Sequence, residues 1–159
     1  MNIKVVCVGK IKEKFYVQAI DEYFKRLSRY CKLSIVQVAD EKTPDKASGT
    51  VNEQIKDKEG ARILASIKDD DYVIALAIEG EMFDSVELAT KINKLGIEGI
   101  SSIVLIIGGS LGLSGEVLSR SNMKLSFSKM TFPHQLMRVI LLEQIYRSYR
   151  IINNEPYHK

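Results

Sequence analysis

The sequence contains no tryptophan and only two cysteines, three prolines and two histidines in 159 residues. Cys7 falls in an apolar run and Cys31 follows a helical pattern, so neither belongs to a C-x-x-C pair or a disulfide framework. Apolar runs such as residues 103–107 are far shorter than the roughly 20 residues that cross a bilayer. The opening MNIKVVCVGK lacks a small-residue cleavage site, which indicates a first strand rather than a secretion signal. These absences favour one cytoplasmic globular domain over residues 1–159.

Charge is spread unevenly along the chain. The formal net charge is only +3, but residues 1–32 hold eight lysines and arginines against three acidic residues, a net charge of +5. Such a segment is typical of a solvated helix face or of a surface that contacts a polyanion such as RNA. Taken alone, the charge favours the solvated face.

Short β-like runs alternate with longer helical patterns, which predicts an α/β domain with a mostly parallel sheet. We expect strands over residues 3–8, 33–38, 72–78, 102–107 and 124–127. We expect helices over residues 13–30, 51–67, 85–95, 116–121 and 134–152. The polar residues 39–50 predict a loop, and Gly96 is expected to cap the third helix.

A cluster of glycines directly follows the apolar strand pattern at residues 102–107. The cluster consists of Gly108, Gly109, Gly112 and Gly115. Ligands bind beyond the carboxyl ends of parallel strands, and glycines let the backbone approach them closely. A turn that binds nothing is an equal alternative at this stage. The stretch has neither the G-x-G-x-x-G spacing of a dinucleotide site nor the G-K-[ST] ending of a P-loop.

The segment LSFSKMTFPHQLMRVILLEQIYRSYR leads from a short strand through a Ser/Thr/Pro loop into a long helix. Pro133 is expected near the first helical turn, and His134 has either a capping, a cofactor-side or a purely structural role. The apolar positions of this helix cover more than one face, which favours packing on a second copy of the chain over a central core helix. They are Leu136, Val139, Ile140, Leu142, Ile145, Tyr146 and Tyr149. Arg138 and Arg150 are expected to bind phosphate or to pair with Glu143 and Glu155.

Several phrases together resemble one family over nearly the whole chain. They are VVCVGKIKEKF, KDKEGARIL, LIIGGSLGL, SFSKMTFPHQLMRVILLEQIYRSYRI and the terminal EPYHK. The chain resembles the RlmH family of SPOUT methyltransferases, which modify a pseudouridine in the large-subunit ribosomal RNA. The resemblance implies an α/β fold with a C-terminal trefoil knot, S-adenosylmethionine as cofactor, no metal, and N3 of a pseudouridine in 23S rRNA as the acceptor.

The resemblance also implies site residues. Those expected to line the S-adenosylmethionine pocket are Leu76, Gly108, Phe127, Ser128, Lys129, Met130, Thr131 and Phe132. The expected catalytic residues are Arg147, Tyr157 and His158. We assign His158 as proton acceptor or orienter, Arg147 as an electrostatic and RNA contact, and Tyr157 as a substrate-positioning ring. Tyr157 and His158 lie on a tail that is able to reach a neighbouring subunit's pocket; without the resemblance a disordered terminus is the favoured interpretation.

Two other classes of function compete with this interpretation. A non-catalytic RNA-binding homodimer would use the basic first helix and the C-terminal arginines and would need no cofactor. A flavodoxin-like oxidoreductase is disfavoured by the missing dinucleotide spacing. Because the chain has no separate RNA-binding domain, we expect the assembled ribosome to supply much of the substrate recognition.

Overall fold

The computed structural model describes all residues from 1 to 159 and alternates strands with helices. The strands are β1 (Asn2–Val8), β2 (Lys32–Val38), β3 (Tyr72–Met82), β4 (Ser102–Ile107) and β5 (Met123–Ser126). The helices are α1 (Lys14–Leu27), α2 (Gly49–Leu64), α3 (Ser85–Ile97), α4 (Gly115–Arg120) and α5 (His134–Ile152). The predicted α/β class is confirmed.

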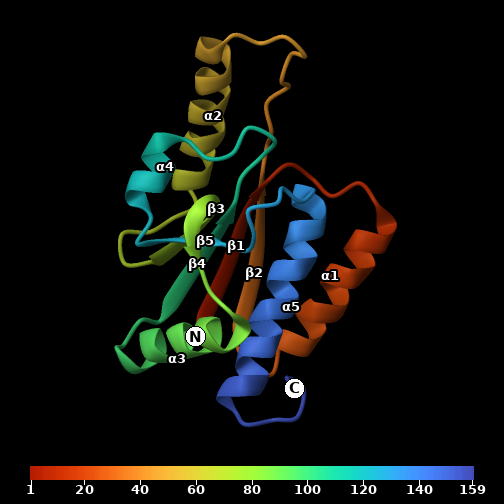
Figure 1. The fold of residues 1–159 in the computed structure, drawn as a ribbon, viewed down its shortest axis with the longest axis vertical. Coiled ribbons are helices and arrows are strands. Elements are labelled where there is room, and N and C mark those ends of the chain that lie inside the picture. The colour runs from red at the N-terminus through yellow and green to blue at the C-terminus, as the bar shows by residue number, and fades with distance from the viewer.

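The five strands form one sheet in the order β2-β1-β4-β3-β5, and every pair is parallel (Figure 1). β1 and β4 lie inside the sheet and are apolar on both faces, as expected of parallel strands that are covered on both sides. All strand carboxyl ends therefore meet at one edge, where the chain leaves the sheet into loops.

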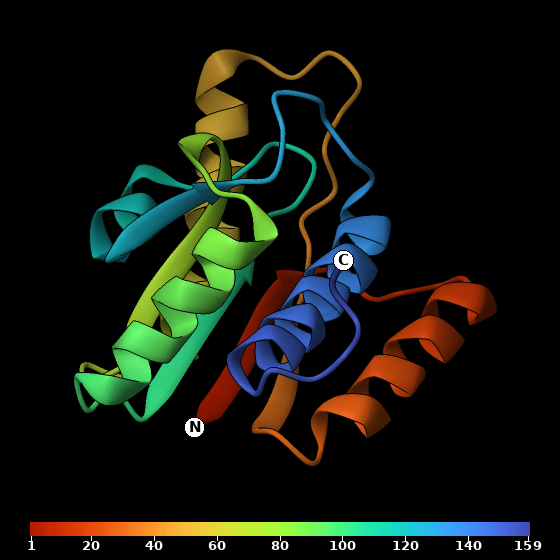
Figure 2. The same ribbon diagram turned by 60° about the horizontal axis from the view of Figure 1, so that its bottom comes forward.

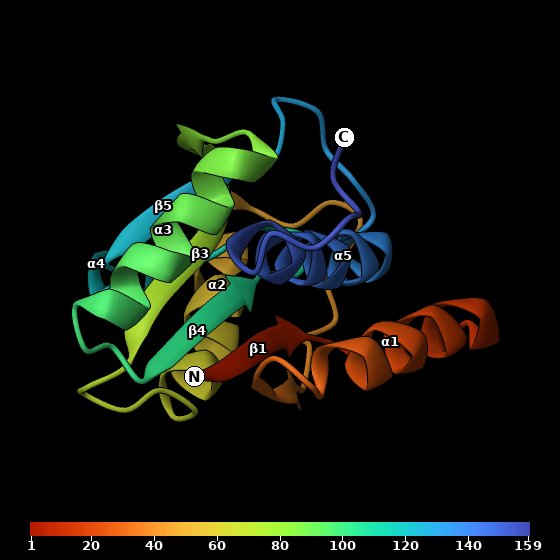
Figure 3. The same ribbon diagram turned by 90° about the horizontal axis from the view of Figure 1, so that it is seen from below.

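Alternate side chains of the strands point to opposite faces of the sheet and pack into two separate hydrophobic cores. On one face, α1, α3 and α5 cover the sheet, and α5 lies between the other two helices (Figures 2 and 3). On the opposite face, α2 and α4 pack against the sheet. β1 shows the alternation: one set faces α5 and the other faces α2, namely Ile3, Val5 and Cys7 against Val6 and Val8.

A bulge interrupts the pairing of β3 with β5. Leu76 and Glu81 both pair with Leu125. The four residues between them are therefore unpaired with β5 and form a bulge at the carboxyl end of the sheet. Gly80 permits this bulge, because a Cβ at that position would lie 2.8 Å from the backbone of Leu125. The sequence pattern predicted only a plain strand over residues 72–78.

Helix boundaries differ from the predicted ones at caps that the pattern did not reveal. α2 begins two residues early because the Ser48 side chain accepts a hydrogen bond from the Val51 amide at 3.2 Å. The cap expected at Gly96 is wrong: α3 continues through Gly96, and the left-handed residue is Gly99 with φ of +90°. Pro133 occupies the N-cap of α5 in an extended conformation (ψ 130°), one position before the helix.

The apolar residues of α5 cover more than one face because the helix contacts several elements of the chain. It packs on the sheet and on both α1 and α3, and none of its residues is fully exposed. The chain itself thus accounts for much of the burial, while the predicted second copy and the trefoil knot stay predictions. No helix has the length and apolar character to span a membrane.

Candidate functional site

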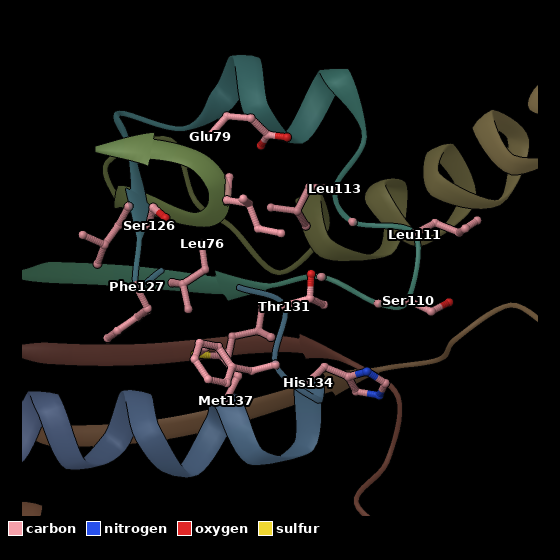
Figure 4. Close-up of a pocket in the computed structure, with 18 of the residues that line it drawn as sticks. Leu76, Glu79, Ser110, Leu111, Leu113, Ser126, Phe127, Thr131, His134 and Met137 are labelled. Carbon is pink, nitrogen blue, oxygen red and sulfur yellow. The ribbon is translucent and has the colours of Figure 1, made fainter. Parts of the chain in front are cut away.

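A cavity of about 530 Å³ opens at the carboxyl edge of the sheet, where four segments converge (Figure 4). The segments are the β3 bulge, the glycine loop (residues 108–113) after β4, the bend (residues 127–132) after β5, and the start of α5. Its size is typical of a small-molecule site. A cavity therefore lies beyond β4, where the sequence predicted a ligand-binding site.

The glycine loop is shaped by close contacts that exclude side chains. A Cβ on Gly108 would lie 3.0 Å from the carbonyl carbon of Gly112, and Gly112 itself has a φ of +87°. A Cβ on Gly109 would lie 3.1 Å from Oε1 of Glu59 on α2. The loop therefore presents backbone alone at its glycines, while Ser110, Leu111 and Leu113 add side chains to the wall (Figure 4). Gly115 lies outside the wall, at the first turn of α4.

The bend after β5 is held by two hydroxyl groups. Ser126 donates a hydrogen bond to the Ser128 carbonyl at 3.1 Å, and the Ser128 hydroxyl accepts one from the Met130 amide at 3.0 Å. These bonds turn the chain back over the sheet edge toward Pro133. The bend and the glycine loop consequently face each other across the cavity.

The structure brings together seven of the eight positions predicted for the cofactor pocket. Leu76, Gly108, Phe127, Ser128, Met130, Thr131 and Phe132 all line the cavity. Lys129 does not line it. Met130 is 73 % exposed, so this side of the cavity opens to solvent.

Apolar and polar side chains are mixed along the wall. In Figure 4, Leu76 and Phe127 share one side of the view with Ser126, and Leu111 shares the other side with Ser110 and His134. The apolar side chains suit an aromatic or aliphatic group, whereas the hydroxyl and imidazole groups can form hydrogen bonds.

His134 lies on the wall as the first residue of α5 and makes no capping hydrogen bond. Burial lowers its pKa below the ordinary value of 6.5, and the guanidinium of Arg138 one turn away lowers it further, while Asp40 opposes both. The imidazole is therefore uncharged at neutral pH. Of the three roles expected for His134, the capping one is wrong.

Arg138 lies in the core, with an exposed fraction of only 2 %. Its guanidinium donates hydrogen bonds to the carbonyls of Val8 and Gly9 at 2.8 and 2.9 Å, so it joins α5 to the end of β1. The prediction that Arg138 binds phosphate or pairs with a glutamate is wrong, because the side chain is inside the protein. Arg150 does pair with Glu155, as expected.

The three predicted catalytic residues gather around the carboxylate of Glu143, in the middle of α5. Oε1 of Glu143 accepts hydrogen bonds from Arg147 at 2.6 Å and from the Tyr157 hydroxyl at 3.0 Å. Nη1 of Arg147 lies 3.2 Å from Nδ1 of His158. Burial and then the Glu143 carboxylate raise the pKa of Tyr157 to about 12, so its hydroxyl stays protonated.

The cavity and this catalytic cluster (Arg147, Tyr157 and His158) are separated within one chain. Arg147 follows His134 by thirteen residues on α5, which places their Cα atoms about 20 Å apart along the helix axis. Figure 1 shows the C-terminus beside the end of α5 opposite to its first residue. One chain thus does not bring the two predicted sets of residues together.

Two features of the site escaped the sequence analysis. The β3 bulge supplies Ala77, Ile78 and Glu79 to the wall, and Glu59 packs against the glycine loop with only 5 % exposure. Glu59 also accepts a hydrogen bond from the Glu41 amide at 3.0 Å. Neither feature has a local sequence signal, because each depends on pairing between distant segments.

Comparison with known proteins places the whole chain in one family. A family model described as a predicted SPOUT methyltransferase matches residues 1–158. Three relatives named ribosomal RNA large subunit methyltransferase H are similar over the full length of both chains, all 159 residues. They come from Clostridium novyi (66 % identical), Clostridium tetani (62 %) and Bifidobacterium animalis subsp. lactis (61 %). With a cavity between glycine loop and bend and this similarity from end to end, the chain belongs to the RlmH family of SPOUT methyltransferases.

Proposed function

We propose that this protein transfers a methyl group from S-adenosylmethionine to N3 of a pseudouridine in 23S rRNA. The proposed substrate is the assembled ribosome, and the proposed working form is a cytoplasmic homodimer. The observation that carries the proposal is the cavity between the glycine loop and the bend, in a chain whose full-length relatives are named rRNA methyltransferases.

The wall of the cavity fits the proposed cofactor. Leu76 and Phe127 offer apolar cover for an adenine ring, and the glycines of the loop offer backbone hydrogen-bonding groups without side chains of their own. When bound, S-adenosylmethionine supplies an electrophilic methyl group on a sulfonium. The protein's task is to align the acceptor nitrogen with that group and to exclude water.

The catalytic cluster offers the groups that an imide acceptor requires. N3 of pseudouridine carries a proton, and negative charge builds on the base as that proton leaves. The Arg147 guanidinium, oriented by Glu143, would stabilise this charge, and His158 would take or orient the proton. The protonated Tyr157 hydroxyl would position the base.

The separation of the cluster from the cavity supports the homodimer. A tail that cannot reach its own cavity along α5 can serve the cavity of a second chain. A direct test mixes two inactive variants: Gly108→Val, which fills the glycine loop, and His158→Ala, which alters the tail. Mixing should restore methylation, because every heterodimer pairs the intact cavity of one chain with the intact tail of the other. Activity that remains absent after subunit exchange would contradict the shared site.

The function is tested with ribosomes from a strain that lacks this gene. Purified protein and tritiated S-adenosylmethionine should label the 23S rRNA, and mass spectrometry of nuclease fragments should place the methyl group on N3 of a pseudouridine. A short naked RNA hairpin should be labelled far more slowly. A non-catalytic RNA-binding homodimer would instead show no heat of cofactor binding by calorimetry and no labelling.

A further inference from the structure

His134 is the only one of the two histidines that lines the cavity, and the proposed chemistry leaves it without a role. It stands at the junction of the bend and α5, and Figure 4 shows it on the same side of the view as Ser110. Its ring is uncharged at neutral pH and offers one nitrogen that can accept a hydrogen bond.

The surroundings of His134 oppose its protonation. Arg138 lies one turn further along α5, and its Nε and Nη1 are buried without a hydrogen-bond partner. This fixed positive charge has no carboxylate bonded to it, so a second charge on His134 would be repelled. Arg138 is thus a buried cation without a paired carboxylate, an arrangement that is costly in free energy.

Charged groups on the neighbouring elements modulate this effect without cancelling it. Asp40, after β2, favours protonation, and Glu59 on α2, which accepts a hydrogen bond from the Glu41 amide, has a pKa that burial raises. On the cavity wall, Lys56 is paired with Glu53 at 2.6 Å, and Glu79 stands on the β3 bulge. The wall at neutral pH thus combines an uncharged imidazole, one paired cation and one carboxylate.

We propose that His134 sets the charge of the ligand that the cavity accepts: the uncharged imidazole admits a cationic cofactor, and protonation of the ring weakens its binding. This inference rests on the proposed function, because S-adenosylmethionine carries a sulfonium and an ammonium against one carboxylate. Its demethylated product, S-adenosylhomocysteine, lacks the sulfonium charge. His134 therefore discriminates between the two most strongly in acid.

Calorimetric titration of the intact protein with each of the two compounds, from about pH 8 to about pH 5, tests the inference. Below the pKa of His134, which is itself lowered from the ordinary 6.5, the affinity for S-adenosylmethionine should fall by up to about tenfold per pH unit. The affinity for S-adenosylhomocysteine should fall less. Circular dichroism at each pH confirms that the protein stays folded.

Three variants separate His134 from other titrating groups. His134→Asn, which keeps a polar side chain but cannot titrate in this range, should bind S-adenosylmethionine with nearly constant affinity. His158→Asn removes the other histidine and tests whether the acid-induced loss belongs to that ring instead. Asp40→Asn removes an exposed carboxylate that favours protonation, so the loss should move to lower pH. A merely structural role of His134 would not shift the profile in this direction.

The outcomes distinguish this inference from the function on which it rests. If neither compound binds at pH 8, the proposed function fails. If both bind with the same pH dependence, or if His158→Asn rather than His134→Asn removes it, the charge-setting role of His134 is overturned while the function stands.

Discussion

Gly80→Ala should damage both the stability and the cavity, because the β3 bulge leaves no room for a methyl group. An ideal Cβ at Gly80 would lie 2.8 Å from backbone atoms of Leu125 and Lys124, whereas ordinary contacts begin at 3.4 Å. The obstructing atoms are backbone and cannot rotate away, so β5 must move from β3. Gly80 has no left-handed φ, so strain in its own conformation is not the cause.

Two opposing effects set the expected loss of stability in Gly80→Ala. Overpacking of this kind costs about 1–3 kcal/mol, and the loss of glycine's freedom in the unfolded chain returns about 0.4–1 kcal/mol. A net loss of about 1–2 kcal/mol should lower the melting temperature by about 2–8 °C in a domain of this size. Since Leu125 and the bulge both line the cavity, cofactor affinity should fall as well.

Gly49→Ala is the matched control for Gly80→Ala. Gly49 is the first residue of α2, and no atom outside its neighbours lies within 4 Å of its ideal Cβ. Alanine should therefore leave the melting temperature unchanged or slightly raised, with unaltered cofactor binding. Thermal denaturation and calorimetry measure both quantities. Equal stability and equal affinity of the two variants would refute the close approach of β3 and β5.

Three further substitutions probe separate parts of the structure. Ser114→Ala removes the hydroxyl that accepts a hydrogen bond from the buried Val117 amide at 3.2 Å, and thermal denaturation should show a loss of about 1 kcal/mol. Glu143→Gln should bring the pKa of Tyr157 down from about 12 toward the ordinary 10, so the absorption of the phenolate should appear at lower pH. An unchanged titration curve would show that Glu143 does not raise the pKa of Tyr157. Lys129→Ala should leave cofactor affinity within about twofold, because Lys129 lies outside the cavity wall; a tenfold loss measured by calorimetry would show that it contacts the cofactor.

The sequence pattern predicted those elements whose signals are local. The helix over residues 134–152 was predicted with its observed bounds, because a proline precedes it and its apolar positions continue without a break. The glycine loop was placed correctly beyond β4, since apolar strand and glycines are adjacent in the sequence. Assignment of a cofactor and an acceptor base came from the family resemblance and not from the pattern.

Features that depend on contacts between distant segments were missed. The β3 bulge needs the backbone of β5 beside it, and residues 77–80 look like an ordinary strand end without that partner. An arginine on a helix is expected at the surface, so the burial of Arg138 followed only from the position of the β1 carbonyls. The boundary error at Gly96 is instead local, because Gly99, three residues further on, adopts the left-handed conformation and the pattern did not distinguish the two glycines.

Helix α5 links the cavity to the catalytic cluster. Its first turn supplies His134 and Met137 to the cavity, its second turn is anchored to the end of β1 through Arg138, and Glu143 in its middle binds Arg147 one turn further on. A helix held on three sides by the sheet, α1 and α3 is rigid, so the distance between its two functional ends is fixed by its length. Within one chain the cluster therefore stays apart from the cavity, and the homodimer proposed above would place the cluster of each chain at the cavity of the other.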